Sequence, residues 1–400
     1  MGLVIRPINL AEDNLEQVSH LLIRNGLNAT KYAITPAAWR FQYIENPNRK
    51  SWVSILIDEE LRSILGHIGL LPLPLIQNSQ QFLAGGISNG VIDCTVRNKL
   101  MQHNNVKSFP IVPLIDKCCK NAFENDVKLI FAFSSIHSLI WKNLHFKLLD
   151  IQVDESWHLN FLDAYKTLVS KLKFVIENRW LSYLIKSYAF FLALCSQVVK
   201  HVSLAKAVKL LINNKVQVVQ FEYFDNSFEP LFKEFVCDHS NVIMYERSIA
   251  YLNWRYESAS CLKYKFTYMG ELIGYCVLRK DSLPGSNVHQ MEDFMILKSR
   301  IDNVSPILAY LLTKENLSFK MQHFLSCDYS FMLFNEFRNH SDTVEVNPLR
   351  SLFCGEKKKI SNPFYYKLND DIMSQETQDS FSDSKNWLIE PLFFTPAFHK

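Results

Sequence analysis

Two histidines have side chains that could exchange a proton near neutral pH, which is the chemistry of a general base. His67 lies in a Gly-His-Ile-Gly sequence with strand character, and His137 opens a short helical sequence. Neither residue is accompanied by a motif that would supply a catalytic partner. A hydrogen-bonded structural histidine is therefore the alternative to a catalytic base at both positions.

Aromatic residues recur with helical spacing in two similar sequences. Trp39 and Tyr43 are four residues apart, which places them on one face of a helix. Trp254, Arg255 and Tyr256 belong to the second sequence, YLNWRYES. The aromatic side chains predict either a core contact that holds each helix to a sheet or a surface on which a substrate stacks.

The stretch from residue 86 to residue 146 predicts the unit that would position a ligand. It reads as a strand, a polar loop, a helix, a buried strand and a second helix, at residues 87–96, 97–108, 109–125, 127–135 and 137–146. Parallel strands need such a crossover, and a ligand site is expected where the first strand leads into its helix. No glycine occurs between Val91 and Asn125, so the loop lacks the small residues of a typical phosphate-binding turn.

The composition is that of a globular protein of roughly two domains. Of the 400 residues, 48% are hydrophobic and 21% are charged, and the formal net charge is +3. No basic stripe with interleaved aromatic residues occurs, so no nucleic-acid partner is expected. The nine cysteines include the adjacent pair Cys118 and Cys119 but no CxxC spacing, which predicts reduced thiols in a cytoplasmic protein without a metal site.

Residues 180–199 are apolar enough to raise the question of membrane contact. Lys186 interrupts the run, so only residues 187–199 are free of charge, which is short for a membrane span. A buried or half-buried helix that links two domains is the favoured interpretation, and membrane contact is not expected. A helix on a membrane surface is the alternative, because lysines flank the segment.

The order of the predicted elements indicates an α/β fold with a central mixed sheet. A strand, two helices and antiparallel strands precede the crossover unit, and the Gly85-Gly86 pair is interpreted as a turn between strands. Strand character resumes at residues 216–224, and a second series of elements follows. In it, YLNWRYES and the hairpin turning at Gly270 correspond to AAWRFQYIENP and the strands around His67. This internal duplication predicts two domains of one fold.

These motifs resemble the tandem GNAT-fold N-acyltransferases found among bacterial cell-surface polysaccharide biosynthesis proteins. The resemblance covers about residues 1–345 and is carried by W-R-x-x-Y-x-x-N-P, G-H-x-G, Y-L-N-W-R-Y and G-E-L-x-G-Y. It implies an α/β (α+β) protein with two GNAT-like domains, each a central mixed sheet flanked by helices, joined by a long helical linker. The predicted parts are an N-terminal domain, the linker, a C-terminal domain and a C-terminal extension, at residues 1–155, 156–214, 215–345 and 346–400.

The resemblance also implies a reaction. An acyl group would pass from acetyl-CoA or another acyl-CoA, as co-substrate, to a small-molecule amine acceptor, commonly an amino sugar, without a metal. The matching donor-binding residues are Thr95, Val96, Lys107, Ser108, Phe109, Pro110, Ser134 and Asn143. The implied substrate-binding residues are Trp39, Tyr43, Trp254, Arg255 and Tyr256.

Three residues are predicted to be catalytic on this basis: Asp93, His67 and His137. Asp93 lies where a carboxylate could accept the proton of the amine, although strand alternation leaves open whether it faces the cleft. Trp141 stands where family members often have a tyrosine acid, and His145 replaces their usual glycine. These departures and the bulky donor loop support a second hypothesis, a catalytically inactive tandem GNAT-fold binding or scaffold protein. The acceptor, the acyl group and the oligomeric state are left open.

Overall fold

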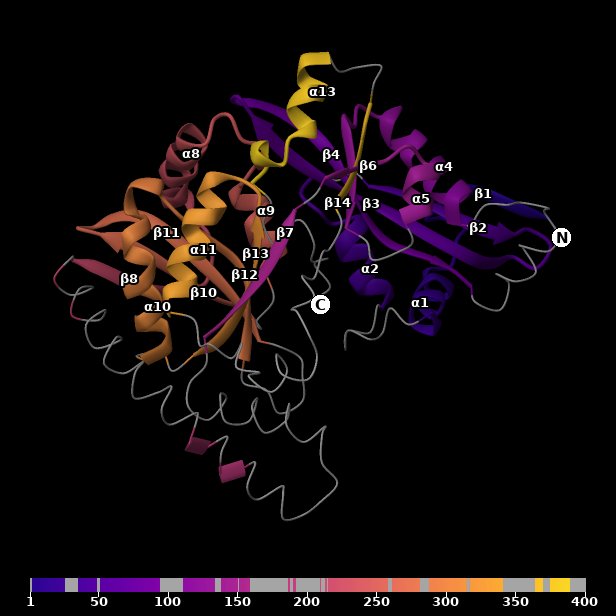
Figure 1. The fold of residues 1–400 in the computed structure, drawn as a ribbon. Coiled ribbons are helices and arrows are strands. Elements are labelled where there is room, and N and C mark those ends of the chain that lie inside the picture. The colour runs from indigo at the N-terminus through magenta and orange to yellow at the C-terminus, as the bar shows by residue number, and fades with distance from the viewer. Residues whose placement is uncertain are drawn as a thin grey trace.

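Two mixed sheets and the helices around them form the protein (Figure 1). The computed structural model describes residues 2–25, 35–48, 51–93, 111–133, 138–149, 151–158, 215–257, 261–280, 288–313, 317–340, 364–369 and 375–388, and the single positions 186, 187, 190, 191, 209, 213 and 315. None of the helices in these residues is long and apolar enough to cross a membrane.

The first sheet has the strand order β1-β2-β3-β4-β5-β14-β6, and β9 (Met244–Tyr245) pairs with the end of β3. Its strands are β1 (Leu3–Pro7), β2 (Trp52–Asp58), β3 (Ser63–Gln77), β4 (Gln80–Ile92), β5 (Leu129–Phe133), β14 (Phe364–Leu368) and β6 (Lys147–Leu149). Neighbouring strands are antiparallel except for β4 and β5. Asn78 and Ser79 both have positive φ and turn the long β3–β4 hairpin, as in turns whose twist matches that of the strands.

Helices cover both faces of this sheet because its strands present apolar side chains alternately to either side. On one face, α1 (Leu15–Arg24) and α2 (Pro36–Tyr43) form a core cluster with β2 side chains such as Ile55. On the other face, α4 (Ile111–Phe123) and α5 (Ser138–Asn143) form a second cluster that includes Leu56. Figure 1 shows the two helix pairs on opposite sides of the strands.

Gly85 and Gly86 lie inside β4, so the predicted turn at this pair is wrong. Both pair in parallel with β5. A Cβ atom on Gly85 would lie 2.9 Å from Leu70 Cδ2, and one on Gly86 would lie 2.9 Å from Leu73 Cδ1. The two glycines therefore leave room for β3 side chains to pack across β4, and the turn lies at residues 78–79 instead.

The second sheet repeats the plan of the first. Its order is β7-β13-β12-β11-β10-β8, formed by β7 (Gln152–His158), β13 (Ser318–Leu325), β12 (Val288–Ile296), β11 (Glu271–Lys280), β10 (Cys261–Tyr268) and β8 (Val216–Phe221). As in the first sheet, one pair, β12 and β13, is parallel. Its helices are α8 (Glu229–Asp238), α9 (Ile249–Arg255), α10 (Val304–Thr313) and α11 (Asp328–His340). This correspondence supports the predicted duplication.

The two halves exchange one strand each. β7 follows the first half in sequence but pairs with β13 of the second sheet, whereas β14 follows the second half but inserts between β5 and β6 of the first. In Figure 1 the magenta β7 lies in the orange sheet and the yellow β14 in the purple one. The predicted boundary at residue 155 therefore passes through β7. The rest of the predicted linker lies almost entirely outside the described residues.

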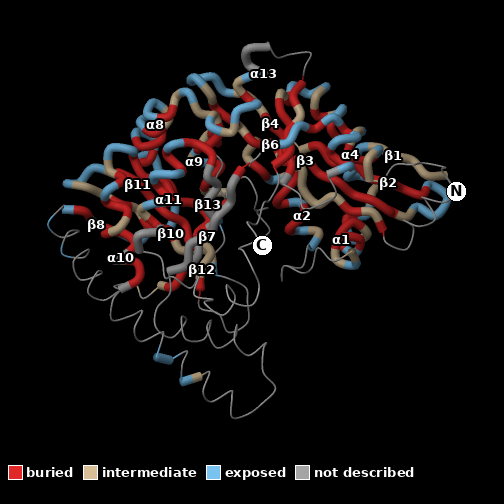
Figure 2. The backbone as a smooth tube through the Cα atoms, in the orientation of Figure 1, coloured by how far each residue is buried: buried red, intermediate tan, exposed pale blue. Residues whose placement is uncertain are grey.

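A continuous core joins the halves. One cluster of buried side chains contains Leu73, Leu129 and Phe131 from the first sheet together with most of the core of the second half. Buried segments run through both sheets in Figure 2. Past β14, α13 (Gln375–Ser382) leads to Trp387, which is fully buried and packs against Phe364 and Phe381. The C-terminal extension is thus part of the core along these residues.

Candidate functional site

The parallel pairing of β4 and β5 is short. It comprises three residue pairs, from Ala84 with Leu129 to Gly86 with Phe131. Beyond Gly86, β4 continues to Ile92 along β3, but no further pairing with β5 is found in the described residues. The main chain of β4 therefore parts from β5 at the strand ends, where a crossover fold is expected to hold a ligand.

A β-bulge interrupts β4 just beyond this point. His67 of β3 pairs with Val91 and Gly69 pairs with Ser88, so β4 has one residue more than β3 between these pairs. Asn89 has φ +55°, a left-handed conformation that few residues other than glycine adopt. We call residues 88–90 the β4 bulge. A bulge leaves main-chain groups out of the ladder, where they can bind a ligand.

His67 holds the bulge from β3. Its Nε2 accepts a hydrogen bond from Trp39 Nε1 at 3.1 Å, and its Nδ1 lies 3.0 Å from the carbonyl oxygen of Asn89, so Nδ1 carries the proton and donates. The ring has no exposed surface, and burial lowers the pKa of His67 from 6.5 to about 4. The imidazole is therefore neutral and fully engaged, which fits the structural histidine rather than the catalytic base.

α2 also holds the bulge, through side chains that contact the His67 ring. The hydroxyl of Tyr43 accepts from Asn89 Nδ2 at 2.9 Å, and Gln42 Nε2 donates to Ser88 Oγ at 3.2 Å. Burial raises the pKa of Tyr43 above its usual range. Trp39 and Tyr43 are each only 1% exposed, so they form part of the core and offer no surface on which a substrate could stack.

Asp93 follows β4 directly and is almost fully buried. Its main-chain N–H donates to Leu65 O at 2.8 Å, and its carboxylate forms an ion pair with Arg24 in the last turn of α1. The carboxylate therefore lies on the α1 face of the sheet. It would have to separate from Arg24 before it could accept a proton from an amine.

The second group of predicted residues lies on α9 and joins the two halves. The Trp254 ring stacks on Phe41 of α2, with 5.4 Å between centroids, and its Nε1 donates to the carbonyl oxygen of Phe41 at 3.2 Å. Arg255 and Tyr256 are buried in the second half, with 7% and 2% exposure. The structure thus separates the predicted substrate residues into one set around the β4 bulge and one set at α9.

Among the predicted donor-binding residues, Asn143 is described and is the exposed last residue of α5. The others lie outside the described residues, as does His137: Thr95, Val96, Lys107, Ser108, Phe109, Pro110 and Ser134. α4 begins at Ile111, directly after this predicted loop. The roles assigned to these residues stay predictions.

Several residues at the bulge were not predicted from the sequence: Gln42, Ser88 and Asn89, and Arg24 beside Asp93. One signal for the bulge was present in the Asn89-Gly90 pair, because a glycine inside a strand pattern suggests a bulge. The hydrogen bonds that hold the bulge join residues up to 46 positions apart, and no sequence spacing indicates them.

The second half has a bulge at the corresponding place but a shorter connection after it. Glu292 is the extra residue of β12, between the pairs Val277 with Asp293 and Leu278 with Met291. Only seven residues, 297–303, then lead into α10, six of them in a 3-10 helix. Eighteen residues, 93–110, separate β4 from α4. The connection at the place of the donor loop is therefore eleven residues longer in the first half than in the second.

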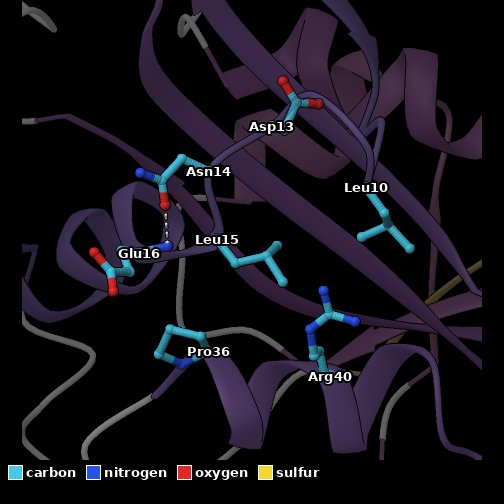
Figure 3. Close-up of a pocket in the computed structure, with 7 residues that line it drawn as sticks. All are labelled: Leu10, Asp13, Asn14, Leu15, Glu16, Pro36 and Arg40. Carbon is cyan, nitrogen blue, oxygen red and sulfur yellow. Dashed lines mark hydrogen bonds between the residues drawn. The ribbon is translucent and has the colours of Figure 1, made fainter.

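A surface hollow of about 470 Å³ lies between the start of α1 and the start of α2 (Figure 3). Its lining residues are Leu10, Asp13, Asn14, Leu15, Glu16, Pro36 and Arg40. Asp13 forms an ion pair with Arg6, and the Asn14 side chain caps α1. None of the residues that hold the β4 bulge lines this hollow. Among the described residues, no group of three or more His, Cys, Asp or Glu side chains gathers as metal ligands would.

The sequence matches no protein-family model and no curated protein, whereas the fold matches solved structures. A probable N-acyltransferase from Enterococcus faecalis V583, described as a conserved protein of unknown function, superposes with a TM-score of 0.52 at 9% identity over 82% of this chain. This chain covers 66% of that protein, just under two thirds of its length. The N-myristoyltransferase of Saccharomyces cerevisiae with bound myristoyl-CoA gives a TM-score of 0.51 at 11% identity, covering 97% of this chain and 89% of that chain.

These similarities establish a fold. The chain is a mixed α/β protein with two mixed sheets, consistent with the tandem GNAT fold, and both similar structures carry the name of an acyltransferase. At identities of 9% and 11% they show the architecture alone.

Proposed function

We propose that the protein is an acyl-CoA-dependent N-acyltransferase whose donor binds where β4 parts from β5. One observation carries the proposal: the β4 bulge, held by His67 and Tyr43, lies just past the last β4–β5 pair and leads into an eighteen-residue connection. The second half has a comparable bulge but a connection of seven residues. The proposal therefore assigns the donor to the first half.

The chemistry follows from this arrangement. Transfer of an acyl group to an amine requires donors that stabilise negative charge on the thioester oxygen. Main-chain N–H groups at the bulge suit that role because they are fixed before the reaction starts. Lys107 and Ser108 would bind the phosphates ahead of α4. With His67 neutral and enclosed, Asp93 and His137 remain the candidate bases, and the acceptor is a small-molecule amine such as an amino sugar.

Calorimetric titration with acyl-CoA tests the proposal. Acetyl-CoA and myristoyl-CoA should be titrated separately, because the yeast enzyme with the similar fold binds myristoyl-CoA and the acyl length is open for this chain. Lys107→Glu should weaken donor binding about tenfold, since it replaces a cation near the phosphates by an anion. Lys117→Glu, the same change on an exposed face of α4, is the matched control and should bind as the wild type does.

The outcome decides between the two hypotheses. No binding heat from either donor at about 1 mM, the upper end of common KM values, would overturn the proposal. Donor binding without release of CoA in the presence of amines would instead support the alternative, a catalytically inactive tandem GNAT-fold binding or scaffold protein. The absence of glycine between Val91 and Asn125 is the observation that favours this alternative.

A further inference from the structure

The second half buries a group of charged side chains around the end of α9. Arg247, Arg255, Lys263, Glu292 and Asp293 are each at most 7% exposed. Arg279 belongs to the same group, and its side chain is 12% exposed. Buried charges are costly unless they are paired, so each of them should have a partner of opposite charge.

Both carboxylates of this group are paired with arginines. Arg247 lies 3.3 Å from Asp293, and the Tyr275 hydroxyl donates to the same carboxylate at 2.6 Å while accepting from Arg247 Nε at 2.9 Å. Arg279 forms an ion pair with Glu292. The carboxylates of this group are thereby engaged by Arg247 and Arg279.

Arg255 has no such partner. No carboxylate among the described residues lies within ion-pair distance of its guanidinium, and its buried Nε has no hydrogen bond. The ring centroid of the adjacent Tyr256 lies 5.7 Å from the Arg255 guanidinium, and its buried hydroxyl is close enough to interact with Arg255 but makes no hydrogen bond of good geometry. The Arg255 Nε is therefore left without an acceptor, and the group contains two more cations than carboxylates, because Lys263 donates to the carbonyl oxygen of Glu222.

The surroundings of Arg255 are rich in positive charge and are least buried at Cys261 and Arg279. Burial raises the pKa of Cys261; the nearby charges of Arg279, Lys263 and Arg255 each oppose this rise, and that of Glu292 adds to it. Cys261 and Arg279 face each other across β10 and β11 and are only partly buried. The described part of the group therefore reaches the protein surface at this end.

We propose that Arg255 and Tyr256 bind an oxyanion, the carboxylate or phosphate of a small ligand. A guanidinium presents parallel N–H donors that match two oxygens of such a group, and the phenolic hydroxyl supplies a further donor. The ligand would neutralise the charge that the fold leaves unpaired. This site lies in the second half and does not depend on the donor site proposed in the first.

The duplicated helix supplies a matched control. Arg40 of α2 follows Trp39 as Arg255 of α9 follows Trp254, but Arg40 is exposed and needs no anion to be stable. Arg40→Gln therefore makes the same chemical change at the corresponding position of the first half.

Calorimetric titration of the whole chain with sodium phosphate and, separately, sodium acetate tests the proposal, with sodium chloride of equal ionic strength as reference. The wild type and Arg40→Gln should bind at least one of the two anions with equal Kd, and the anion that binds identifies the chemistry. Arg255→Gln should weaken binding about tenfold or more, and Tyr256→Phe about fivefold.

Absence of binding by the wild type to both anions would overturn the proposal, whether or not acyl-CoA binds. Unchanged affinity in Arg255→Gln would also overturn it. If Arg255→Gln does not fold, Tyr256→Phe decides, because it keeps the ring and removes only the hydroxyl. If Arg255→Met is more stable than the wild type in phosphate, the buried cation destabilises the fold and no bound anion compensates it, which would also overturn the proposal.

Discussion

The imidazole of His67 connects α2, β3 and the β4 bulge. It accepts from the indole of Trp39 and donates to the main chain of Asn89, with no exposed surface. Because one nitrogen must accept and the other donate, protonation of the ring would break the bond to Trp39 and place a charge in the core. The arrangement therefore requires the neutral ring.

This requirement predicts a pH dependence of stability. In the unfolded chain His67 takes up a proton as the pH falls through 6.5, whereas in the folded chain its pKa is about 4. The unfolded state thus binds more protons between these values, and the free energy of unfolding decreases as the pH falls. The contribution lost between pH 7 and pH 5 is about 2 kcal/mol. Urea unfolding of wild type and His67→Gln at both pH values measures it.

The variant is the necessary comparison, because burial also lowers the pKa of His239. That residue therefore adds to the dependence of the unfolding free energy on pH. The loss of stability from pH 7 to pH 5 should be about 2 kcal/mol smaller in His67→Gln than in the wild type. Equal losses in the two proteins would show that His67 is accessible to protons in the folded state.

Gly69 provides the space that Tyr43 occupies beside the bulge. A Cβ atom on this residue would lie 2.3 Å from Tyr43 Cε1 and 2.6 Å from its hydroxyl oxygen. Gly69→Ala should therefore lower the free energy of unfolding by about 2–3 kcal/mol, as overpacking in a core does. Gly90→Ala is the control: its Cβ would be 3.4 Å from the nearest atom, an ordinary contact. Similar losses in both variants, measured by urea unfolding, would contradict this account.

At the level of the element, the end of α5 contains a strained residue. His145 has φ +60°, and Phe146 N donates to Trp141 O at 2.9 Å, which is the pattern of a helix that ends with a left-handed residue. Glycine adopts this conformation without steric cost. We expect His145→Gly to raise the free energy of unfolding by about 0.5–1 kcal/mol. His145→Ala keeps the Cβ atom, so it should give no increase in the same urea titration.

The elements show what local pattern can and cannot predict. The helix over residues 109–125 and the strands on either side of it were predicted because their periodicity is local, and α4, β4 and β5 confirm them. β14 was missed because five residues in a polar, turn-rich extension acquire strand character only by pairing with β5, more than two hundred positions away. β7 likewise pairs with β13, more than 150 positions away.

The sequence likewise predicted only part of the candidate site. The pairing of Trp39 with Tyr43 on one helix face was readable from their spacing, as was the presence of His67 in a strand. Their role was not, because it depends on a bulge in β4 and on contacts with Asn89 that only the folded chain forms. The burial of His67, Trp39 and Tyr43 favours their structural interpretation, one of the alternatives that the sequence left open.

At the level of the whole molecule, the exchange of β7 and β14 ties the stability of each half to the other. Without the C-terminal residues the first sheet loses the strand between β5 and β6, and one core cluster contains side chains of both halves. Separate folding of residues 1–155 is therefore not expected. Unfolding should be one cooperative transition, with the same midpoint when followed by tryptophan fluorescence and by far-ultraviolet circular dichroism.

A single residue of β14 tests this coupling most directly. Phe364 is fully buried and stacks on Phe131 of the first sheet, with ring centroids 5.6 Å apart, while it also contacts Trp387. Phe364→Ala should remove about 3–5 kcal/mol and shift the unfolding of both halves together. Lys367→Ala, a partly exposed position on the same strand, should shift neither by more than about 0.5 kcal/mol. Two separated transitions in Phe364→Ala, with the second at the wild-type midpoint, would mean that the second half is stable without the strand it gives to the first.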